Sequence, residues 1–334
     1  MEFVQYRSGM DDEGRRLDKV LRILFPDTPL SNFYSYIRKG LIRINDKKTK
    51  QDYHIVCGDM ICVARFLNLS RRNETTAKTS ESLQQQDEIP CVFCNEHILI
   101  LNKPYDIPVH ETGSYKGITL NQIVLKKYPG TGNSLAFTPG PLHRLDRKTT
   151  GLICFSQSIE GARQFTELLK KHEIRKTYLT IIDGRLTDDL LFSDMLSKAE
   201  TSDKSAFYTM IVTDEKETAP ENAKKAITKI HPVASGFYEK KAVTLAEVTI
   251  ETGRTHQIRS QCASHGYPLF GDSAYGGTRY SCLFLHAWKL DIQKPNALGL
   301  PGSISSPLPA RFCEFIKKYL PAVDISLYNQ SLEL

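Results

Sequence analysis

A polar segment at residues 70–87 divides the chain into a short N-terminal part and a long C-terminal part. Its only large apolar residue is Leu83, so the segment cannot bury enough surface to offset the entropy lost on ordering. We therefore expect a flexible linker over 67–88, between a domain at 1–66 and a second domain at 89–334. A chain of 334 residues is long enough for two domains and for at least one substantial core.

The N-terminal part is predicted to form two short helices followed by short strands. Apolar residues at positions 17, 20, 21 and 24 share one helical face, which predicts a helix over 16–24. A second helix is expected to begin with Ser31 as its N-cap and to end at Gly40, which can adopt the left-handed conformation common after helices. Residues 41–45 and 60–63 are apolar runs next to polar turns, which predicts strands.

Basic residues are dense between positions 38 and 50, where Asp46 is the one acid. The cluster consists of Arg38, Lys39, Arg43, Lys47, Lys48 and Lys50. A charge run is commonly a solvated face, but its position across a helix, a turn and a strand favours RNA binding. The net charge of +6 permits such a partner without requiring one. With a flexible linker, the two domains should move independently until RNA fixes them.

The second domain is expected to be α+β, with a mixed, largely antiparallel sheet flanked by helices and loops. Strands are predicted over 98–103, 152–155, 177–182 and 244–250, and helices over 161–171 and 309–320. The stretch at 194–221 is mostly polar and charged, so we expect a loop or an excursion beyond the sheet.

Composition argues against several classes of protein. No apolar run reaches 18 residues, so no segment is expected to span a membrane. The eight cysteines mostly adjoin apolar residues, and no signal peptide is visible, which favours a reducing cytoplasm. Cys91 and Cys94 lack a second pair at zinc spacing, and His256 and His265 lack neighbouring ligands. We therefore expect no metal.

The segment from His143 to Gly151 is the first candidate for chemistry. It places Asp146 among four basic or potentially basic residues: His143, Arg144, Arg147 and Lys148. Nearby cations favour the charged form of a carboxylate, and the same cations would attract a polyanion. The simpler interpretation is a turn or capping aspartate.

Two further segments have unusual composition. Tyr178 follows Lys176 and Thr177 at the start of a predicted strand, where a tyrosine is commonly part of the core. Residues 251–259 hold two arginines, a histidine and a glutamine, which is too polar for a core strand. They either form a surface ion-pair network or partner a buried anion, for which Asp146 is the candidate.

Taken together, these segments resemble the RluA family of RNA pseudouridine synthases. The matching elements are Asn102-Lys103-Pro104, His143-Arg144-Leu145-Asp146 through Gly151, Lys176-Thr177-Tyr178, Gly253 to Arg259, and Leu285-His286-Ala287. The N-terminal part is similar to the S-four-like RNA-binding domain, with Arg16-Leu17-Asp18, Ser31, Gly40 and Gly58-Asp59 in matching places. Two departures are Asp106, where the family has glycine, and Ser260-Gln261, where it has valine and histidine. We interpret both as tuning of the substrate groove.

The resemblance implies a role for each matching residue. Asp146 would stabilise or capture the positive charge that develops on the ribose when uracil departs, through a covalent adduct or a glycal. Arg259 is its expected salt-bridge partner, with Arg254 as the second choice and otherwise a phosphate ligand. Arg144 would fill the space of the flipped base. Tyr178 would stack on uracil and offer a hydroxyl that could act as a general base. The remaining substrate contacts are assigned to His143, Ile258, Arg147 and Lys148.

We therefore expect an RNA pseudouridine synthase that acts on large-subunit ribosomal RNA, with transfer RNA as the alternative substrate. The reaction transfers no electrons, so no cofactor is expected, and the protein is expected to be a monomer. A non-catalytic, ribosome-associated RNA-binding protein is a competing interpretation, against which the set of Asp146, Tyr178 and Arg259 argues. A glycoside hydrolase would need a second catalytic carboxylate, which the motif segments do not supply.

Overall fold

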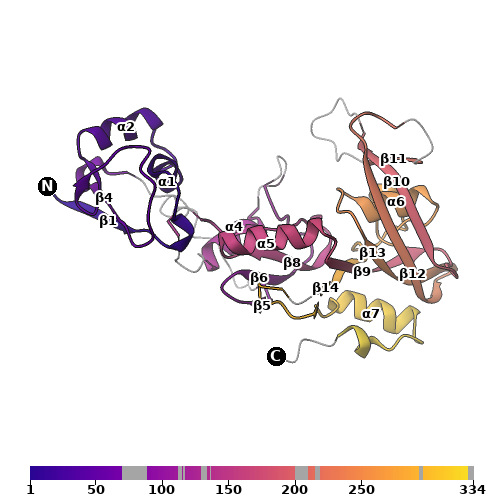
Figure 1. Ribbon diagram of the computed structural model, residues 1–334. Coiled ribbons are helices and arrows are strands. Elements are labelled where there is room, and N and C mark those ends of the chain that lie inside the picture. Colours follow the sequence, from indigo (N-terminus) through magenta and orange to yellow (C-terminus); the bar gives the residue numbers. More distant parts are fainter. Residues whose placement is uncertain are drawn as a thin grey trace.

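The computed structural model describes residues 1–69, 89–111, 115, 117–128, 134–135, 137–199, 210–214, 219–292 and 296–329. Residues 70–88, which make up most of the predicted linker, lie outside this part of the chain. Figure 1 shows the N-terminal domain at one end of an elongated molecule and the long strands β10 and β12 at the other.

The N-terminal domain pairs a small antiparallel sheet with two helices. Its elements are β1 (Phe3–Arg7), α1 (Leu17–Leu24), α2 (Leu30–Arg38), β2 (Ile42–Ile44), β3 (Lys47–Lys48) and β4 (Met60–Ala64). The strand order is β1-β4-β2-β3. Both predicted helices and both predicted strands are confirmed. The N-cap prediction is wrong, because α2 begins at Leu30 with Pro29 at the N-cap, and Ser31 is already inside the helix.

Apolar side chains from both helices and the sheet form the core of this domain. Phe25 and Phe33 are fully buried there, and Leu67 and Leu69 pack against the same core. Gly40 has φ +70°, the left-handed conformation expected after α2. Residues 67–69 therefore belong to the N-terminal domain and not to the linker.

The second domain is built on one large sheet. In order across the sheet, its main strands are β11 (Met210–Asp214), β10 (Leu190–Lys198), β12 (Lys224–Tyr238), β13 (Lys241–Ile250), β9 (Ile174–Asp183), β14 (Leu285–Ile292), β8 (Thr150–Ser156), β6 (Ile98–Lys103) and β5 (Cys91–Cys94). The short strands β7 (Gly140–Pro141) and β15 (Ser303–Ser305) pair with β8 and β14. Among the described strands, β8 and β14 pair in parallel and the other pairings are antiparallel. The predicted α+β class is confirmed.

Helices cover both faces of this sheet. Each strand contributes to the cores on both faces, because its successive side chains point to opposite sides. The helices are α4 (Leu120–Lys127), α5 (Ile159–Lys170), α6 (Gln257–Ser264) and α7 (Ala310–Tyr319). Ile98 and Ile100 of β6 pack in one core with α5, whereas Leu99 and Leu101 pack in another with α4. In the same way, Leu179 belongs to the core of α7 and Tyr178 to that of α6.

Within the stretch at 194–221, the described residues 194–198 and 210–214 form strands. Strand β10 continues to Lys198, and β11 pairs with it in register from Asp194 opposite Asp214 to Lys198 opposite Met210. The sequence pattern did not predict this strand, because Asp194 is a charged residue at an inward-facing position. Asp194 is 3% exposed. Hydrogen bonds from Gln261 and His265 to the Asp194 carboxylate compensate for the burial of its charge.

The two domains touch each other in the structure. Asp12 is completely buried, and its carboxylate accepts hydrogen bonds from Ser134 Oγ at 2.6 Å and from the Leu135 backbone at 2.7 Å. The neighbouring Asp11 accepts from the Ile159 backbone at 3.2 Å, at the first turn of α5, where a helix dipole favours negative charge. These hydrogen bonds join the two domains in this structure.

Within the described residues, none of the helices is both long enough and apolar enough to cross a membrane.

Candidate active site

A pocket of about 260 Å³ opens on the face of the sheet that α6 covers. Its walls come from the loop before β8, from β9, from the end of β13 and from α6. Residues lining it include His143, Arg144, Asp146, Lys176, Tyr178, Arg254, His256, Ile258 and Arg259. The pocket therefore gathers the three segments that the sequence singled out.

Asp146 lies in the turn that leads into β8. Its backbone carbonyl accepts from Thr149 N–H at 3.1 Å, so the residue is a turn aspartate as far as its backbone is concerned. Its side chain is 16% exposed and points away from that turn toward α6. The carboxylate is therefore free of the capping role that the simpler interpretation gave it.

A buried lysine holds the Asp146 loop in place. Lys103 is fully buried at the end of β6, and its Nζ donates to the carbonyls of Pro104, Ile107 and Arg147, each at 2.9 Å. These three acceptors match the three N–H donors of an ammonium group. Burial lowers the pKa of Lys103 to about 7, against the opposing charge of Asp146. Lys103 thus ties the loop after β6 to the loop that carries Asp146.

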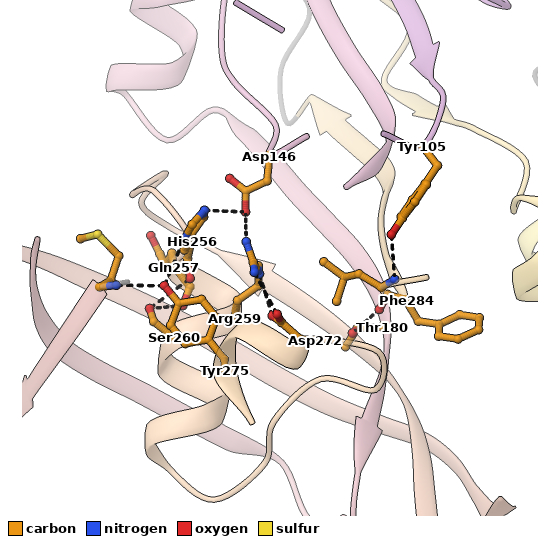
Figure 2. A network of polar contacts seen from close by, with 12 residues as sticks. Tyr105, Asp146, Thr180, His256, Gln257, Arg259, Ser260, Asp272, Tyr275 and Phe284 are labelled. Carbon is orange, nitrogen blue, oxygen red and sulfur yellow. Dashed lines mark hydrogen bonds and ion pairs between the residues drawn. The ribbon is translucent and has the colours of Figure 1, made fainter. Parts of the chain in front are cut away.

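Arg259 is held between two carboxylates (Figure 2). Its Nη1 lies 3.2 Å from Asp146 Oδ2, while Nε and Nη2 bind the two oxygens of Asp272 at 2.6 and 2.9 Å. Burial alone would lower the pKa of Arg259, but hydrogen bonds and charges from Asp272 and Asp146 outweigh it and raise this pKa. The guanidinium is therefore permanently charged and fixed in orientation before any substrate arrives.

Arg254, the second choice for this contact, lies elsewhere. It is exposed at the pocket rim, and its Nε donates to the Lys225 backbone carbonyl at 3.0 Å. The first helical turn of α6 separates the two arginines, so that Arg259 is buried and Arg254 faces solvent. Arg259 is the arginine that pairs with Asp146.

Tyr178 projects from β9 into the same pocket and is 7% exposed. Burial, followed by the negative charge of Asp146, raises its pKa. A tyrosine in this state keeps its proton near neutral pH, which disfavours the expected role of its hydroxyl as a general base. Its ring face and its O–H donor remain available to a base or a ribose in the pocket.

The expected RNA-contacting cations divide into paired and unpaired side chains. Arg144 and Lys148 are exposed, and no ion pair involves them within the described part of the chain. Arg147 instead donates from Nε to Asp106 at 2.8 Å. Arg147 therefore has an internal anion in the place where we expected an RNA phosphate.

His143 has a structural contact. Its Nε2 accepts from the Cys154 backbone N–H at 3.1 Å, which fastens the loop before β8 to the strand itself. Burial, with a smaller effect of the Lys176 charge, lowers the pKa of His143 to about 3. The ring is neutral and lines the pocket wall, so it can contact a substrate without adding positive charge.

Ser260 and Gln261 do not face the substrate groove, and that expectation is wrong. Ser260 is 2% exposed and Gln261 is fully buried. Gln261 donates to Asp194 at 2.6 Å and accepts from Thr228 Oγ1 at 2.6 Å. A helix places residues one and two positions apart on different faces. Gln261 therefore fastens α6 to β10 and β12, and Ser260 donates to carbonyls of its own helical turn, while Ile258 and Arg259 face the pocket.

The other departure, Asp106, is exposed in the loop after β6 and is not among the residues that line the pocket. It has φ +67°, a conformation that strains residues other than glycine. Its carboxylate holds Arg147, as described above. Asp106 therefore neutralises a cation of the loop that carries Asp146.

The basic cluster of the N-terminal domain is largely exposed. Arg38, Lys39, Lys47, Lys48 and Lys50 are exposed around the end of α2 and the β2–β3 hairpin. The Lys48 side chain packs against Gly40, which brings the hairpin next to the helix end. Arg43 differs, because it is partly buried, donates to the Gly40 carbonyl at 2.8 Å and stacks on Phe3. Arg43 is a structural member of this surface.

Four residues of the site were not assigned a role from sequence. They are Lys103, His256, Asp272 and Tyr275. Asp272 and Tyr275 follow Gly271, whose φ of +84° and contact with the Cys282 carbonyl leave no room for a side chain. The pair Gly271-Asp272 was the feature of the sequence that could have pointed to these two residues. Across the described residues, no group of three or more histidines, cysteines or carboxylates is placed to hold a metal ion.

The arrangement can stabilise a cation-like sugar carbon beside a carboxylate, in a pocket with an aromatic wall and an exposed arginine at its mouth.

Residues 97–264 match the family described as RNA pseudouridylate synthase, which is half of the chain. Ribosomal large subunit pseudouridine synthase C of Vibrio vulnificus is 26% identical over 311 residues, covering 89% of this chain and 90% of the relative. Ribosomal large subunit pseudouridine synthase D of Pseudomonas aeruginosa is 28% identical over 315 residues, covering 90% of each.

A solved structure shares the fold. Human RNA Pseudouridylate Synthase Domain Containing 1 superimposes with a TM-score of 0.54 at 23% identity, covering 76% of this chain and 93% of its own. The expected resemblance to RluA-type enzymes is confirmed by the family match and the relatives. The chain therefore belongs to the RNA pseudouridylate synthase family.

Proposed function

We propose that this enzyme isomerises specific uridines of large-subunit ribosomal RNA to pseudouridine. The names of the two bacterial relatives support this class of RNA. The observation that carries the proposal is the Asp146 carboxylate, which faces the pocket and is fixed by an arginine that a second carboxylate holds in turn.

The reaction breaks the bond from uracil N1 to ribose C1′ and forms a bond from C5 to the same carbon, so no atoms or electrons are gained or lost overall. The C5 proton leaves and N1 regains a proton. Asp146 would stabilise or capture the positive C1′, or remove the C2′ proton to give a glycal. Tyr178 would stack on the freed base, and Ile258 would pack against the pocket wall beside it. Because Tyr178 keeps its proton, we assign it a stacking and donating role.

RNA would reach this pocket through base flipping, which costs a few kcal/mol. Arg144 is exposed and free of ion pairs within the described residues, which suits it to occupy the vacated position and to stack on neighbouring bases. Lys148 and Arg254 lie at the surface near the pocket and would contact phosphates.

The N-terminal domain would add affinity. Its order of two helices, a glycine and strands supports the S-four-like assignment, and its exposed lysines and arginines supply the positive surface that RNA binding requires. The contact of Asp11 and Asp12 with the catalytic domain would hold this surface at a set distance from the pocket. All eight cysteines carry free thiols, which supports action in a reducing cytoplasm.

Asp146→Asn tests the proposal directly. The variant should bind RNA but release no tritium from carbon-5-labelled uridine in large-subunit RNA, whereas Asp189→Asn, an exposed aspartate paired with His231, should behave as wild type. Full turnover by Asp146→Asn would refute the mechanism.

Mapping pseudouridines in cells with and without the protein tests the substrate. Loss of pseudouridine from large-subunit RNA supports the proposal. Loss from transfer RNA alone would replace it with the alternative substrate.

Changing Lys47, Lys48 and Lys50 together to Gln should weaken RNA binding and flatten its salt dependence, and an unchanged affinity would remove the N-terminal domain from the proposal.

A further inference from the structure

His256 is a titratable residue of the pocket whose role the proposed mechanism leaves open. It precedes α6 with φ +52°, in the left-handed region. Its Nε2 lies 3.8 Å from Asp146 Oδ2, and its Nδ1 lies 2.9 Å from Tyr275 Oη. Figure 2 shows the ring between the two, with the carboxylate on one side and the tyrosine on the other.

The hydrogen bonds of Tyr275 favour one position for the His256 proton. Tyr275 Oη accepts the backbone N–H of Met210, the first residue of β11, at 2.9 Å. The hydroxyl has one proton of its own to donate, and His256 Nδ1 is its one acceptor in the described part of the chain. A hydroxyl that donates to Nδ1 requires this nitrogen to be unprotonated, and a neutral imidazole then carries its proton on Nε2.

We propose that Tyr275 is a positioning residue that fixes His256 as the Nε2–H tautomer, so that this N–H faces Asp146 Oδ2. The assignment of the His256 tautomer rests on the hydrogen bonds alone. Its effect on catalysis rests on the proposed function. Burial favours the neutral imidazole by lowering the pKa of His256, with Asp146 opposing. The charged groups that act on the ring are Asp146, Arg259, Asp272 and Arg144.

The arrangement distinguishes the two oxygens of Asp146. Arg259 Nη1 binds Oδ2, and His256 Nε2–H faces the same oxygen. Oδ1 accepts no hydrogen bond within the described residues. Oδ1 is therefore the oxygen available to ribose, while Oδ2 carries the fixed donors. The two donors would draw negative charge to Oδ2 and orient Oδ1 toward the substrate.

Tyr275→Phe isolates the hydroxyl. The Arg259 guanidinium lies 5.0 Å from the centre of the Tyr275 ring, and phenylalanine keeps that cation–π contact. In the wild-type protein, ¹⁵N NMR of labelled histidine should show His256 with a protonated Nε2 and an unprotonated Nδ1. In Tyr275→Phe, the signals should shift toward a mixture of tautomers. His256→Ala, which lacks the signal, assigns it.

A kinetic cycle tests the positioning role. We expect Tyr275→Phe to lower the single-turnover rate about tenfold, the effect of one hydrogen bond in a transition state, with RNA affinity unchanged within about twofold. In a His256→Ala background, Tyr275→Phe should cause no further loss, because the hydroxyl acts through the imidazole. Matching thermal unfolding curves of wild type and Tyr275→Phe serve as the folding control.

Three outcomes would overturn the inference. They are a wild-type His256 protonated on Nδ1, a tautomer unaffected by Tyr275→Phe, or an equal loss of rate in the His256→Ala background. The NMR readout needs no substrate, so failure of the proposed function, seen as turnover by Asp146→Asn, remains distinguishable from failure of this assignment.

Discussion

Removing the charge of Asp272 should release Arg259 and damage both stability and activity. Asp272 is 3% exposed and accepts two hydrogen bonds from Arg259, at 2.6 and 2.9 Å. Asp272→Asn keeps the size of the side chain, but the amide can accept only one of these bonds and turns an NH₂ group toward the guanidinium. Arg259 would then be a buried cation held chiefly by Asp146 at 3.2 Å.

The magnitude follows from the burial of the pair. Breaking a buried ion pair by removing one partner costs about 3–5 kcal/mol. At roughly 2–4 °C of Tm for each kcal/mol, the catalytic domain should melt about 6–20 °C lower. A displaced Arg259 no longer orients Asp146, so the single-turnover rate should fall on the order of 100-fold, while RNA affinity changes little.

Urea and thermal unfolding measure the stability, and tritium release measures the rate. Glu167→Gln is the matched control, because Glu167 pairs with Lys170 at 2.8 Å while both side chains are more than half exposed. That surface pair should contribute little to stability. If Asp272→Asn loses no more stability than the control and keeps its rate, the bidentate pair does not hold the site together.

Two further predictions concern the loop after β6. Burial lowers the pKa of Lys103 to about 7 from 10.5, so between these pH values the unfolded chain binds the proton that the folded one has released. This lysine should therefore make the free energy of unfolding rise with pH, by up to ~1.4 kcal/mol per unit. Lys103→Met should remove that rise in urea titrations between pH 7 and 9, and an identical slope would contradict the assignment. Asp106→Gly should free Arg147 and relieve a left-handed φ, tightening RNA binding and steepening its log–log salt slope by ~0.7–0.9. Asp106→Asn, which removes only the charge, should give the same change in slope, and an unchanged slope in both variants would show that Arg147 contacts no phosphate.

Local sequence patterns predicted most elements, because each depends on nearby residues. Amphipathic spacing located α1 and α5, and apolar runs located β6, β8, β9 and β13. The same patterns failed where a polar residue is buried. Asp194 interrupts the apolar run of β10, and only Gln261 and His265, from α6 and the residue after it, make that position tolerable.

The sequence likewise predicted residues of the candidate site but not the contacts between them. Asp146 and Arg259 stand out as charged residues in unusual segments, yet they lie 113 positions apart. Their contact depends on the strand order that brings β8 and β9 together through β14 and places α6 over that face of the sheet. Asp272, Tyr275 and the burial of Gln261 share this dependence.

The sequence by itself determined the α+β class, the family resemblance and the identity of the acid that lines the pocket. The tertiary structure decided which cation reaches that acid, which cation is already neutralised by Asp106, and which polar residues serve the scaffold. The physical reason is that helix and strand propensities act over a few residues, whereas a buried charge is acceptable only when the whole fold delivers its partner.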